Sequence, residues 1–470
     1  MNYKEKRNHV LALIESTLIG EIDQRQLLTQ VVTDKIMAED FNQSFYKGIG
    51  QTSSDKLLKV IEFDIISLTK AFLRNTTAIV FAVLNIVFAS SKSKKESSIG
   101  WTYGVPSQYF STLVNLEKLR DFLDQKITSQ GIQPPLQYLI QSSSVTNLKG
   151  TDRIQVVRHV GLAILKSANS GKSKLLLVTL ARTSKWISMS FRNPILWRVG
   201  LEYVIDLQAI DIRRSAKDLL VTTQTHLLNP PIAFQSSVEW QKIMFWYSDN
   251  GRQILGRDSS EADYSYLARA EIDLHFVWTN SWASILAAQN KSAEVVAIGP
   301  IIFSNLDVRE SNPSQNLKRS GRILIFDVTP KKIADDKSIY SEEIMKDFIK
   351  DIIEVCEERQ VGLNLHLKPK RKYSKHDSKR YISYLSESDG KITTLKWDCD
   401  SQSEIESSEL VICIPFTSPA LISKFLGVPC IFYSPINGFV FERDYEGILV
   451  IQGKHELAAW FSQNDDKETF

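Results

Sequence analysis

The second half of the chain contains a strand-like run that ends in a cluster of positive charge. The apolar run Leu363–Leu367 is followed at once by Lys368, and Lys370 and Arg371 come within the next three residues. Pro369 cannot continue a central strand, so the chain is expected to leave the sheet there. Because ligands bind at the carboxyl ends of parallel strands, these cations could hold a phosphate or a carboxylate. The alternative is an ordinary solvated loop.

A second predicted strand end carries small hydroxyl residues. The apolar run that begins at Glu409 ends at Pro415, and Thr417 and Ser418 follow, with Pro419 at a first helical position. Ser418 is predicted to be the N-cap of the next helix. The amides of a helix start and two hydroxyls can hold an anion without a metal. The alternative is ordinary N-capping with no ligand.

Carboxylates and aromatic residues follow other predicted strands. Asp249 lies in a polar turn, where it could accept a proton or bond only to local backbone amides. Asp327 could face a ligand or cap its own loop. Trp101 and Tyr103 form an aromatic turn that could contact a ligand or pack in the core. His275, alone in an apolar strand, is more typical of a core residue.

The composition limits the class of protein. The chain has 470 residues, enough for two domains, with 43% hydrophobic and 24% charged residues, as in ordinary globular proteins. The net charge is only +3, so the positive charge near Lys368 is local, which argues against a nucleic-acid binder. The four cysteines have no metal-ligand spacing and fit buried thiols in a reducing compartment. No His/Asp/Glu cluster suggests a metal, and no signal peptide is expected.

Hydrophobic periodicity divides the chain into three parts. Residues 1–95 are predicted to be a helical extension; it includes the apolar run 78–89, which is shorter than the roughly 20 residues that span a bilayer. That run is either a buried core element or a membrane-surface segment helped by the basic residues after it. Residues 96–305 alternate strands and helices, with one helix expected over 153–168, and a polar linker follows at 304–321. Residues 320–470 alternate apolar strands and helices, which predicts a doubly wound parallel sheet.

The segment Glu409–Pro435 carries a resemblance to a known family. It combines a strand, a turn with small hydroxyls, a helix ending Leu-Gly-Val-Pro and a further strand. This arrangement resembles the donor-binding half of GT-B glycosyltransferases, especially those that build bacterial surface polysaccharides. The resemblance extends from about 321 to 450, is weaker from about 100 to 303, and is absent before that. It implies an α/β protein with two Rossmann-like (GT-B-like) domains facing a central cleft, without a cofactor or a catalytic metal.

Three short motifs make the chain similar to enzymes of this fold that use CMP-activated acidic sugars. They are Ser-Asp-Asn-Gly at 248–251, the pair Lys368-Pro369, and the pair Thr417-Ser418. The chain departs from the family pattern at Lys368, where those enzymes have histidine. A lysine could still pair with a phosphate as a point charge.

The resemblance implies a role for each candidate residue. Asp249 would be the catalytic base and Lys368 would stabilise the departing phosphate. His366 would share the side of the strand on which Lys368 lies. Acceptor sugars would stack on Trp101 and Tyr103. The implied donor-binding residues are His366, Lys370, Pro415, Thr417, Ser418 and Asp327.

The implied function is transfer of a sugar, such as a nonulosonate or Kdo from a CMP donor, onto a lipid-linked or growing surface polysaccharide. Two alternatives stay open: a GT-B transferase using a UDP- or GDP-sugar, and a non-catalytic GT-B-like partner in a polysaccharide assembly complex. The expected partners are a nucleotide-sugar donor and a glycan or lipid-linked acceptor, and no nucleic acid. The expected location is the cytoplasm, with peripheral association at the inner face of the membrane.

Overall fold

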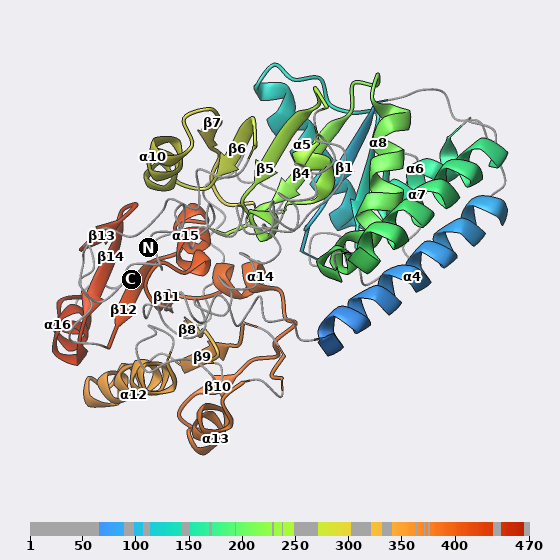
Figure 1. Ribbon diagram of the computed structural model, residues 1–470. Coiled ribbons are helices and arrows are strands. Elements are labelled where there is room, and N and C mark those ends of the chain that lie inside the picture. The colour runs from blue at the N-terminus through green and yellow to red at the C-terminus, as the bar shows by residue number, and fades with distance from the viewer. Residues whose placement is uncertain are drawn as a thin grey trace.

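The computed structural model contains two β-sheets with helices packed on them (Figure 1). The helices expected before residue 65, and the linker expected at 304–321 apart from Gly321, lie outside the described residues. The structure describes residues 65–88, 98–106, 113–142, 151, 153–168, 172–192, 194–227, 230–236, 238–248, 271–301, 321–330, 341–361, 364–370, 372–374, 377–435 and 443–464.

The first sheet has seven strands in the order β3-β2-β1-β4-β5-β6-β7, and every neighbouring pair is parallel. Its first strand in sequence is therefore a central strand. The bounds are β1 (Ile99–Thr102), β2 (Gln137–Gln141), β3 (Ile154–Val157), β4 (Leu219–Thr223), β5 (Gln241–Phe245), β6 (Leu274–Val277) and β7 (Glu294–Ala297).

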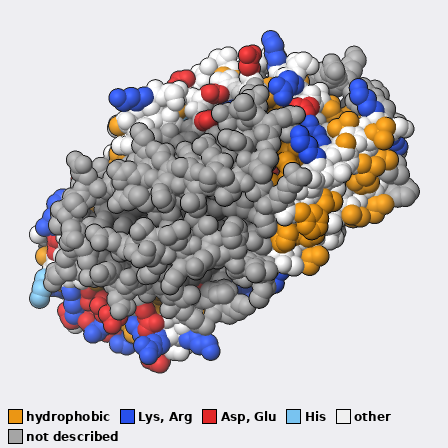
Figure 2. Space-filling view, viewed as in Figure 1, with side chains coloured by type: hydrophobic (Ala, Val, Ile, Leu, Met, Phe, Trp, Pro, Cys, Tyr) orange, Lys and Arg blue, Asp and Glu red, His pale blue; other side chains and the backbone are white. Residues whose placement is uncertain are grey.

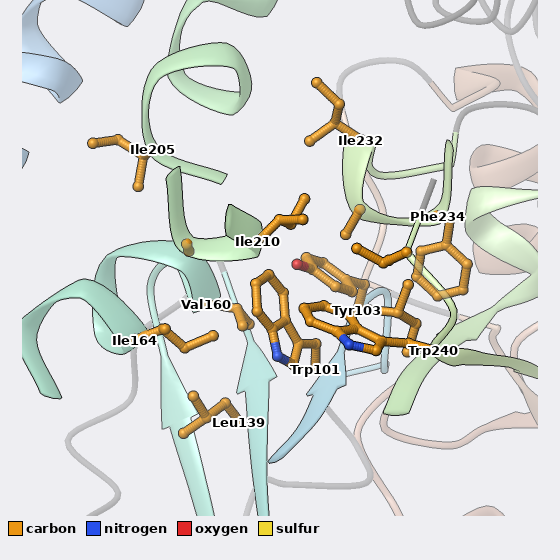
Figure 3. Packing of buried hydrophobic residues seen from close by; sticks show 14 of the residues in the cluster. Trp101, Tyr103, Leu139, Val160, Ile164, Ile205, Ile210, Ile232, Phe234 and Trp240 are labelled. Carbon is orange, nitrogen blue, oxygen red and sulfur yellow. The ribbon is translucent and has the colours of Figure 1, made fainter. Parts of the chain in front are cut away.

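Helices cover both faces of this sheet. On one face, α5 (Leu113–Ser129) contributes Leu116, Leu119 and Leu123 to a hydrophobic cluster with the strands. The opposite face has a second cluster, part of which Figure 3 shows around Trp101 and Trp240. The helices that contribute to this cluster are α4 (Ile65–Phe88), α6 (Val160–Ser167), α7 (Lys172–Arg192), α8 (Leu207–Arg213), α9 (Ile232–Gln235) and α10 (Asn280–Gln289), with the shorter 3₁₀ and π segments Pro194–Val199 and Glu202–Asp206.

Residues 78–88 of the predicted apolar run form the end of α4, which is a single helix of 24 residues. One side of this helix, with Ile79, Ala82 and Ile86, is buried in the same cluster as Trp101. The described part of the predicted extension therefore packs on the first domain. The other side of α4 is exposed. The core element therefore describes one face of the helix, and the membrane-surface segment stays a prediction.

The single helix predicted over 153–168 is wrong in its first half. Residues 154–157 form β3, and α6 begins only after His159, which is its N-cap. Ile154, Val156 and Val157 are β-branched and favour a strand. The helical spacing of the apolar residues hid this change of structure.

The second sheet also has seven strands, in the order β10-β9-β8-β11-β12-β14-β13. Only the terminal β13–β14 pair is antiparallel. The bounds are β8 (Arg322–Phe326), β9 (Asn364–Lys368), β10 (Thr393–Thr394), β11 (Leu410–Cys413), β12 (Cys430–Ser434), β13 (Asp444–Tyr445) and β14 (Ile448–Gln452).

Helices also pack on both faces of the second sheet. One cluster joins the strands to α12 (Glu342–Glu358), α13 (Lys379–Glu387) and α16 (Lys454–Asn464). The other cluster joins them to α14 (Ser401–Glu406) and α15 (Ser418–Phe425). Both sheets place their first strand centrally, with the second and third strands on one side and the fourth and fifth on the other. This is the order of doubly wound domains, so the predicted fold class of two Rossmann-like domains is confirmed.

The two domains touch near the ends of β6 and β7. Trp278 of the first domain belongs to the hydrophobic cluster of the second. The Ser281 amide donates to Oε1 of Glu446 at 2.9 Å, and the Phe425 ring lies against Gly299. Within the described ranges, no helix is long and apolar enough to cross a membrane.

Candidate functional site

The turn between β11 and α15 lies at the carboxyl end of a central strand. Pro415 and Phe416 are buried in it, and α15 starts at Ser418. The predicted helix start is confirmed, but the N-cap is Thr417, one residue before the predicted cap. The Thr417 hydroxyl donates to the carbonyl of Ile414 at 2.9 Å, so it closes the turn instead of capping an amide.

Phe416 has a left-handed backbone conformation, with a φ of 61°. For a residue other than glycine this conformation costs about 1–2 kcal/mol, so other interactions must hold it. The Phe416 ring supplies them, because its centroid lies 4.9 Å from that of Tyr445 and 5.8 Å from that of Phe432. Backbone outliers of this kind cluster at ligand sites, which makes this turn a candidate site.

The basic segment after β9 is organised differently. The Lys368 side chain is buried, with 4% of its surface exposed. Its ammonium donates to the carbonyl of Trp397 at 2.7 Å and to that of Pro369 at 3.2 Å. Lys368 therefore holds the loop that follows β10, and these two bonds engage two of its three N–H donors. Of the other predicted cations, Lys370 is exposed and Arg371 lies outside the described residues.

Asp327 anchors the same segment from the end of β8. Its Oδ1 accepts from the Lys370 amide at 3.1 Å, and its Oδ2 accepts from the hydroxyls of Tyr381 at 3.1 Å and Thr329 at 3.3 Å. Burial raises the pKa of Asp327 to about 6, and these three donors oppose that rise. Of the two predictions for this carboxylate, capping of the local loops describes its contacts better than facing a ligand.

The sheet order separates the two predicted anion sites. β8 lies between β9 and β11, so their ends are two strand spacings, roughly 10 Å, apart. The Lys368 ammonium points still further away, because Trp397 follows β10 on the opposite side of β9. The expectation that Lys368 and the Thr417–Ser418 turn act on one phosphate is therefore corrected: the structure does not bring them together.

His366 is half-buried on β9, two residues before Lys368. Burial lowers the pKa of His366, with a further contribution from the nearby Arg322, while Glu404 opposes it. Its Nδ1 is buried without a hydrogen-bond partner among the described residues. A neutral imidazole here is a weak candidate for binding a phosphate.

Sequence reasoning missed a polar network at the strand ends of the first sheet. Gln224 lies directly after β4. Its side-chain Nε2 donates to the Ser248 hydroxyl at 2.8 Å, and its Oε1 accepts from the backbone amide of Tyr247 at 2.9 Å. Thr223 donates to the Gly104 carbonyl at 2.7 Å. These bonds fix the loops after β1, β4 and β5 relative to one another. The polar run Thr-Thr-Gln-Thr-His at 222–226, which also fits the end of a strand, was the available signal.

Asp249, the predicted catalytic base, lies just outside the described residues, so its role stays a prediction. The residue before it, Ser248, belongs to the polar network that Gln224 organises. The network therefore fixes the chain up to the point where Asp249 begins.

Trp101 and Tyr103 do not offer a surface for acceptor sugars. Trp101 is fully buried, its indole donates to Asp218 at 3.0 Å, and its ring packs 5.1 Å from that of Trp240. Tyr103 is 2% exposed and packs on Phe234 (Figure 3). The alternative of ordinary packing describes both residues, because a buried ring has no face for a ligand.

His275 is a core residue, as expected. It is fully buried, burial lowers its pKa to about 3, and its Nδ1 accepts from the Trp246 indole at 3.4 Å. In the part of the chain that the structure describes, no group of three or more His, Cys, Asp or Glu residues could hold a metal ion.

Comparison with known proteins gives one family match. Residues 182–461 match the family described as "Polysaccharide biosynthesis PFTS motif protein". The sequence Pro-Phe-Thr-Ser occurs in this chain at 415–418, which is the turn with the left-handed Phe416. A search of curated proteins finds no match.

The chain is also similar to several solved structures. A UDP-GlcNAc 2-epimerase from Methanocaldococcus jannaschii is 12% identical, with a TM-score of 0.40, over 79% of this chain and 93% of the other. A trehalose-phosphate synthase from Burkholderia xenovorans is 8% identical, with a TM-score of 0.43, over 79% and 93%. The wall teichoic acid polymerase TagF is 11% identical, with a TM-score of 0.42, over 85% and 89%. The fold itself follows from the strand order of the two sheets.

Proposed function

The chain belongs to the polysaccharide biosynthesis PFTS motif family, and from this premise we propose that it is a glycosyltransferase of the GT-B type. It transfers a sugar from a nucleotide donor to a lipid-linked or growing polysaccharide acceptor, at the cytoplasmic face of the membrane. The second domain binds the donor and the first domain supplies the catalytic base.

One observation carries this proposal: the four residues that spell the family motif form the turn from β11 into α15. In doubly wound sheets ligands bind at the carboxyl ends of the strands. The motif occupies such an end on a central strand, and its second residue holds a conformation that only the surrounding packing stabilises.

This turn has the chemistry to stabilise a leaving nucleotide. When the bond to the sugar breaks, negative charge develops on the donor phosphate, and fixed dipoles that point at it lower the barrier. The Ser418 amide is the first of α15, where the helix dipole favours an anion, and its hydroxyl is a further donor. Pro419 has no amide hydrogen, so the Ser418 amide, and not that of Pro419, is the backbone donor at this helix start.

Proton removal from the acceptor hydroxyl is assigned to Asp249. The bond from Gln224 to Ser248 fixes the chain immediately before this carboxylate, which would limit its freedom when the acceptor binds. Asp249→Asn should then abolish turnover while nucleotide binding and the melting temperature stay at parental values. If the parent binds a nucleotide but never turns over a donor, the chain is the non-catalytic partner instead.

A CMP-activated acidic sugar is the donor that we propose to test first, against UDP- and GDP-sugars. The Thr417–Ser418 pair supports it. Lys368 does not support this donor, because its ammonium donates to two backbone carbonyls. Lys368 enters the proposal only as a positioning residue for the loop at Trp397.

The test is a thermal-shift measurement with CMP, UDP and GDP. A nucleotide at 100 times its Kd stabilises the folded state by about 2.7 kcal/mol, which raises the melting temperature of a domain of this size by several degrees. One nucleotide should give this shift in the parent and a smaller one in Ser418→Ala. The proposal is rejected if none of the three nucleotides changes the melting temperature of the parent.

A further inference from the structure

Exposed apolar side chains are concentrated on two neighbouring helices of the first domain. Of the 12 large hydrophobic residues that are exposed in the described parts of the chain, eight lie on α4 and α7. Figure 2 shows hydrophobic side chains (orange) gathered on one side of the molecule, over the helices that Figure 1 labels α4 and α7. The eight residues are Leu73, Val80, Phe81, Leu84, Leu177, Val178, Leu180 and Phe191. We call this surface the α4–α7 face.

The spacing of these residues places them in stripes. On α4, residues 73, 80, 81 and 84 recur at helical intervals, and on α7 residues 177, 180, 184, 188 and 191 do the same, with serines at 184 and 188. Leu177 is 68% exposed and Phe191 71% exposed. Phe72 links the two helices, because its ring lies 6.4 Å from that of Phe191.

These stripes are separate from the sides of α4 and α7 that pack in the core. The opposite side of α4 is buried through Ile79, Ala82 and Ile86, and α7 is buried through Leu175 and Trp186. Each helix therefore has an apolar side in the core and a second apolar side in contact with solvent, and packing of this domain explains only the first.

The charge on the same helices has one sign. Neither α4 nor α7 contains Asp or Glu, while α4 has two basic residues and α7 has five. Lys70, Arg74, Lys174 and Lys185 are exposed. Acids do lie on neighbouring elements: Asp211 of α8 is paired with Arg182 and Arg214, and Glu202 begins the π segment that packs on both helices.

Apolar stripes on two helices that carry basic residues and no acidic ones fit the surface of an anionic bilayer. The apolar side chains enter the boundary between headgroups and acyl chains, and the cations bind the anionic headgroups. A second copy of the chain fits less well, because a two-fold interface would bring the same cations together. We propose that the α4–α7 face docks the protein flat on an anionic membrane.

The experiment is flotation of the full-length protein with vesicles of phosphatidylglycerol and phosphatidylcholine, or of phosphatidylcholine alone. The parent should float with the anionic vesicles at low salt. The triple variant Leu84→Gln/Leu177→Gln/Leu180→Gln should lower the partition coefficient at least about tenfold, since each inserted side chain loses its apolar burial. Lys70→Glu/Lys174→Glu should lower it by about tenfold or more, and only for the anionic vesicles.

Matched control variants carry the same substitutions elsewhere on the described surface. Leu136→Gln/Leu449→Gln and Lys291→Glu change exposed residues outside α4 and α7 and should float like the parent. The melting temperature of the triple variant should equal that of the parent. A fall of several degrees would mean that the chain itself covers the face, which overturns the proposal.

Three further results overturn it: a parent that does not float with anionic vesicles, a triple variant that floats like the parent, and a dimeric parent that the triple variant makes monomeric without a change in flotation. Nucleotide stabilisation is measured separately. A failure here is therefore distinct from a failure of the proposed donor site.

Discussion

The sequence predicts an anion site at two strand ends of the second sheet, those of β9 and β11. In the structure these two strand ends have different contacts. At the end of β9 the Lys368 cation is buried and bonded to backbone carbonyls, and the buried Asp327, at the end of β8, accepts from the Lys370 amide. After β11 there is no charged side chain in the turn, but the backbone bends through a left-handed phenylalanine into a helix start. The number of charges in a segment thus says little about which of them a ligand can reach.

The physical reason is the cost of burying an unpaired charge. A lysine that ends a central strand is drawn into the protein with its strand, so its ammonium must find acceptors, and backbone carbonyls of the next loop supply them. A helix start has no charged side chain to bury, and its first amides, whose direction the backbone fixes, are satisfied by a cap, by water or by a ligand.

The largest effect should come from the packing that holds the β11 turn. Phe416→Ala removes a buried ring from between Phe432 and Tyr445 and should lower the free energy of unfolding by about 3–5 kcal/mol, measured by urea denaturation. Phe425→Ala, a half-exposed phenylalanine at the end of the same helix, should cost under about 1 kcal/mol. Equal losses for the two variants would mean that the ring does not hold the turn.

The next effect is on turnover. Ser418→Ala removes a hydroxyl at the helix start and should lower kcat by roughly 10- to 1000-fold, as for removal of one donor to a developing negative charge. Ser423→Ala is the control, because that hydroxyl, on the same helix, donates to the Pro419 carbonyl at 2.8 Å. If Ser418→Ala kept parental turnover while substitutions after β9 abolished it, the anion site would lie at the end of β9 and not at the end of β11.

Substitution of Lys368 should lower the free energy of unfolding more than it lowers turnover. Lys368→Met leaves the carbonyls of Pro369 and Trp397 without their charged donor and should cost about 2–3 kcal/mol of unfolding free energy. Lys372→Met, at an exposed position four residues later, should change neither stability nor turnover. A Lys368→Met protein with parental stability and a greatly raised KM for the donor would restore Lys368 as a ligand of the phosphate.

The smallest effect is a pH dependence at Asp327. Its pKa is raised to about 6 in the folded chain from an unfolded value near 3.8, so between these values the folded state binds more protons than the unfolded state. Stability from this group is therefore present at low pH and is lost as the pH rises through about 6. Between about pH 5 and pH 7 the parent should lose about 1 kcal/mol relative to Asp327→Asn, measured by denaturation at each pH. A constant difference between the two proteins would mean that Asp327 does not titrate in this range.

The sequence was sufficient for the architecture of the second domain, because its strands are continuous apolar runs and its helices have clear caps. The Ser341 hydroxyl, for example, accepts from the Ile344 amide at the start of α12. The location of the β11 turn followed from the same pattern. In the first domain, β3 was missed because its β-branched residues also fit the spacing of the helix that follows.

Side-chain direction could not be predicted from the sequence. Alternation along β9 places Lys368 on one side of its strand, but whether its ammonium meets a carbonyl or a ligand depends on β10, which joins the sheet beside it 25 residues later. Similarly, Trp101 looked like an aromatic strand end, and only the packing of Trp240 and the position of Asp218 show that it is buried. These contacts join segments far apart in the chain, and local sequence patterns do not predict them.

The short helix α15 joins two places that would otherwise be independent. It begins at the turn with Phe416, and about 12 Å away, at its other end, Phe425 lies against Gly299 of the first domain and Lys424 donates to the Glu446 carbonyl. Glu446 in turn accepts from the Ser281 amide of the first domain. Eight residues of helix act as a stiff rod, so any rotation of one domain that keeps these contacts must tilt the rod and shift the amides at its start. For the proposed donor site, a movement of the two domains that keeps these contacts would therefore also move the amides assigned to the donor phosphate.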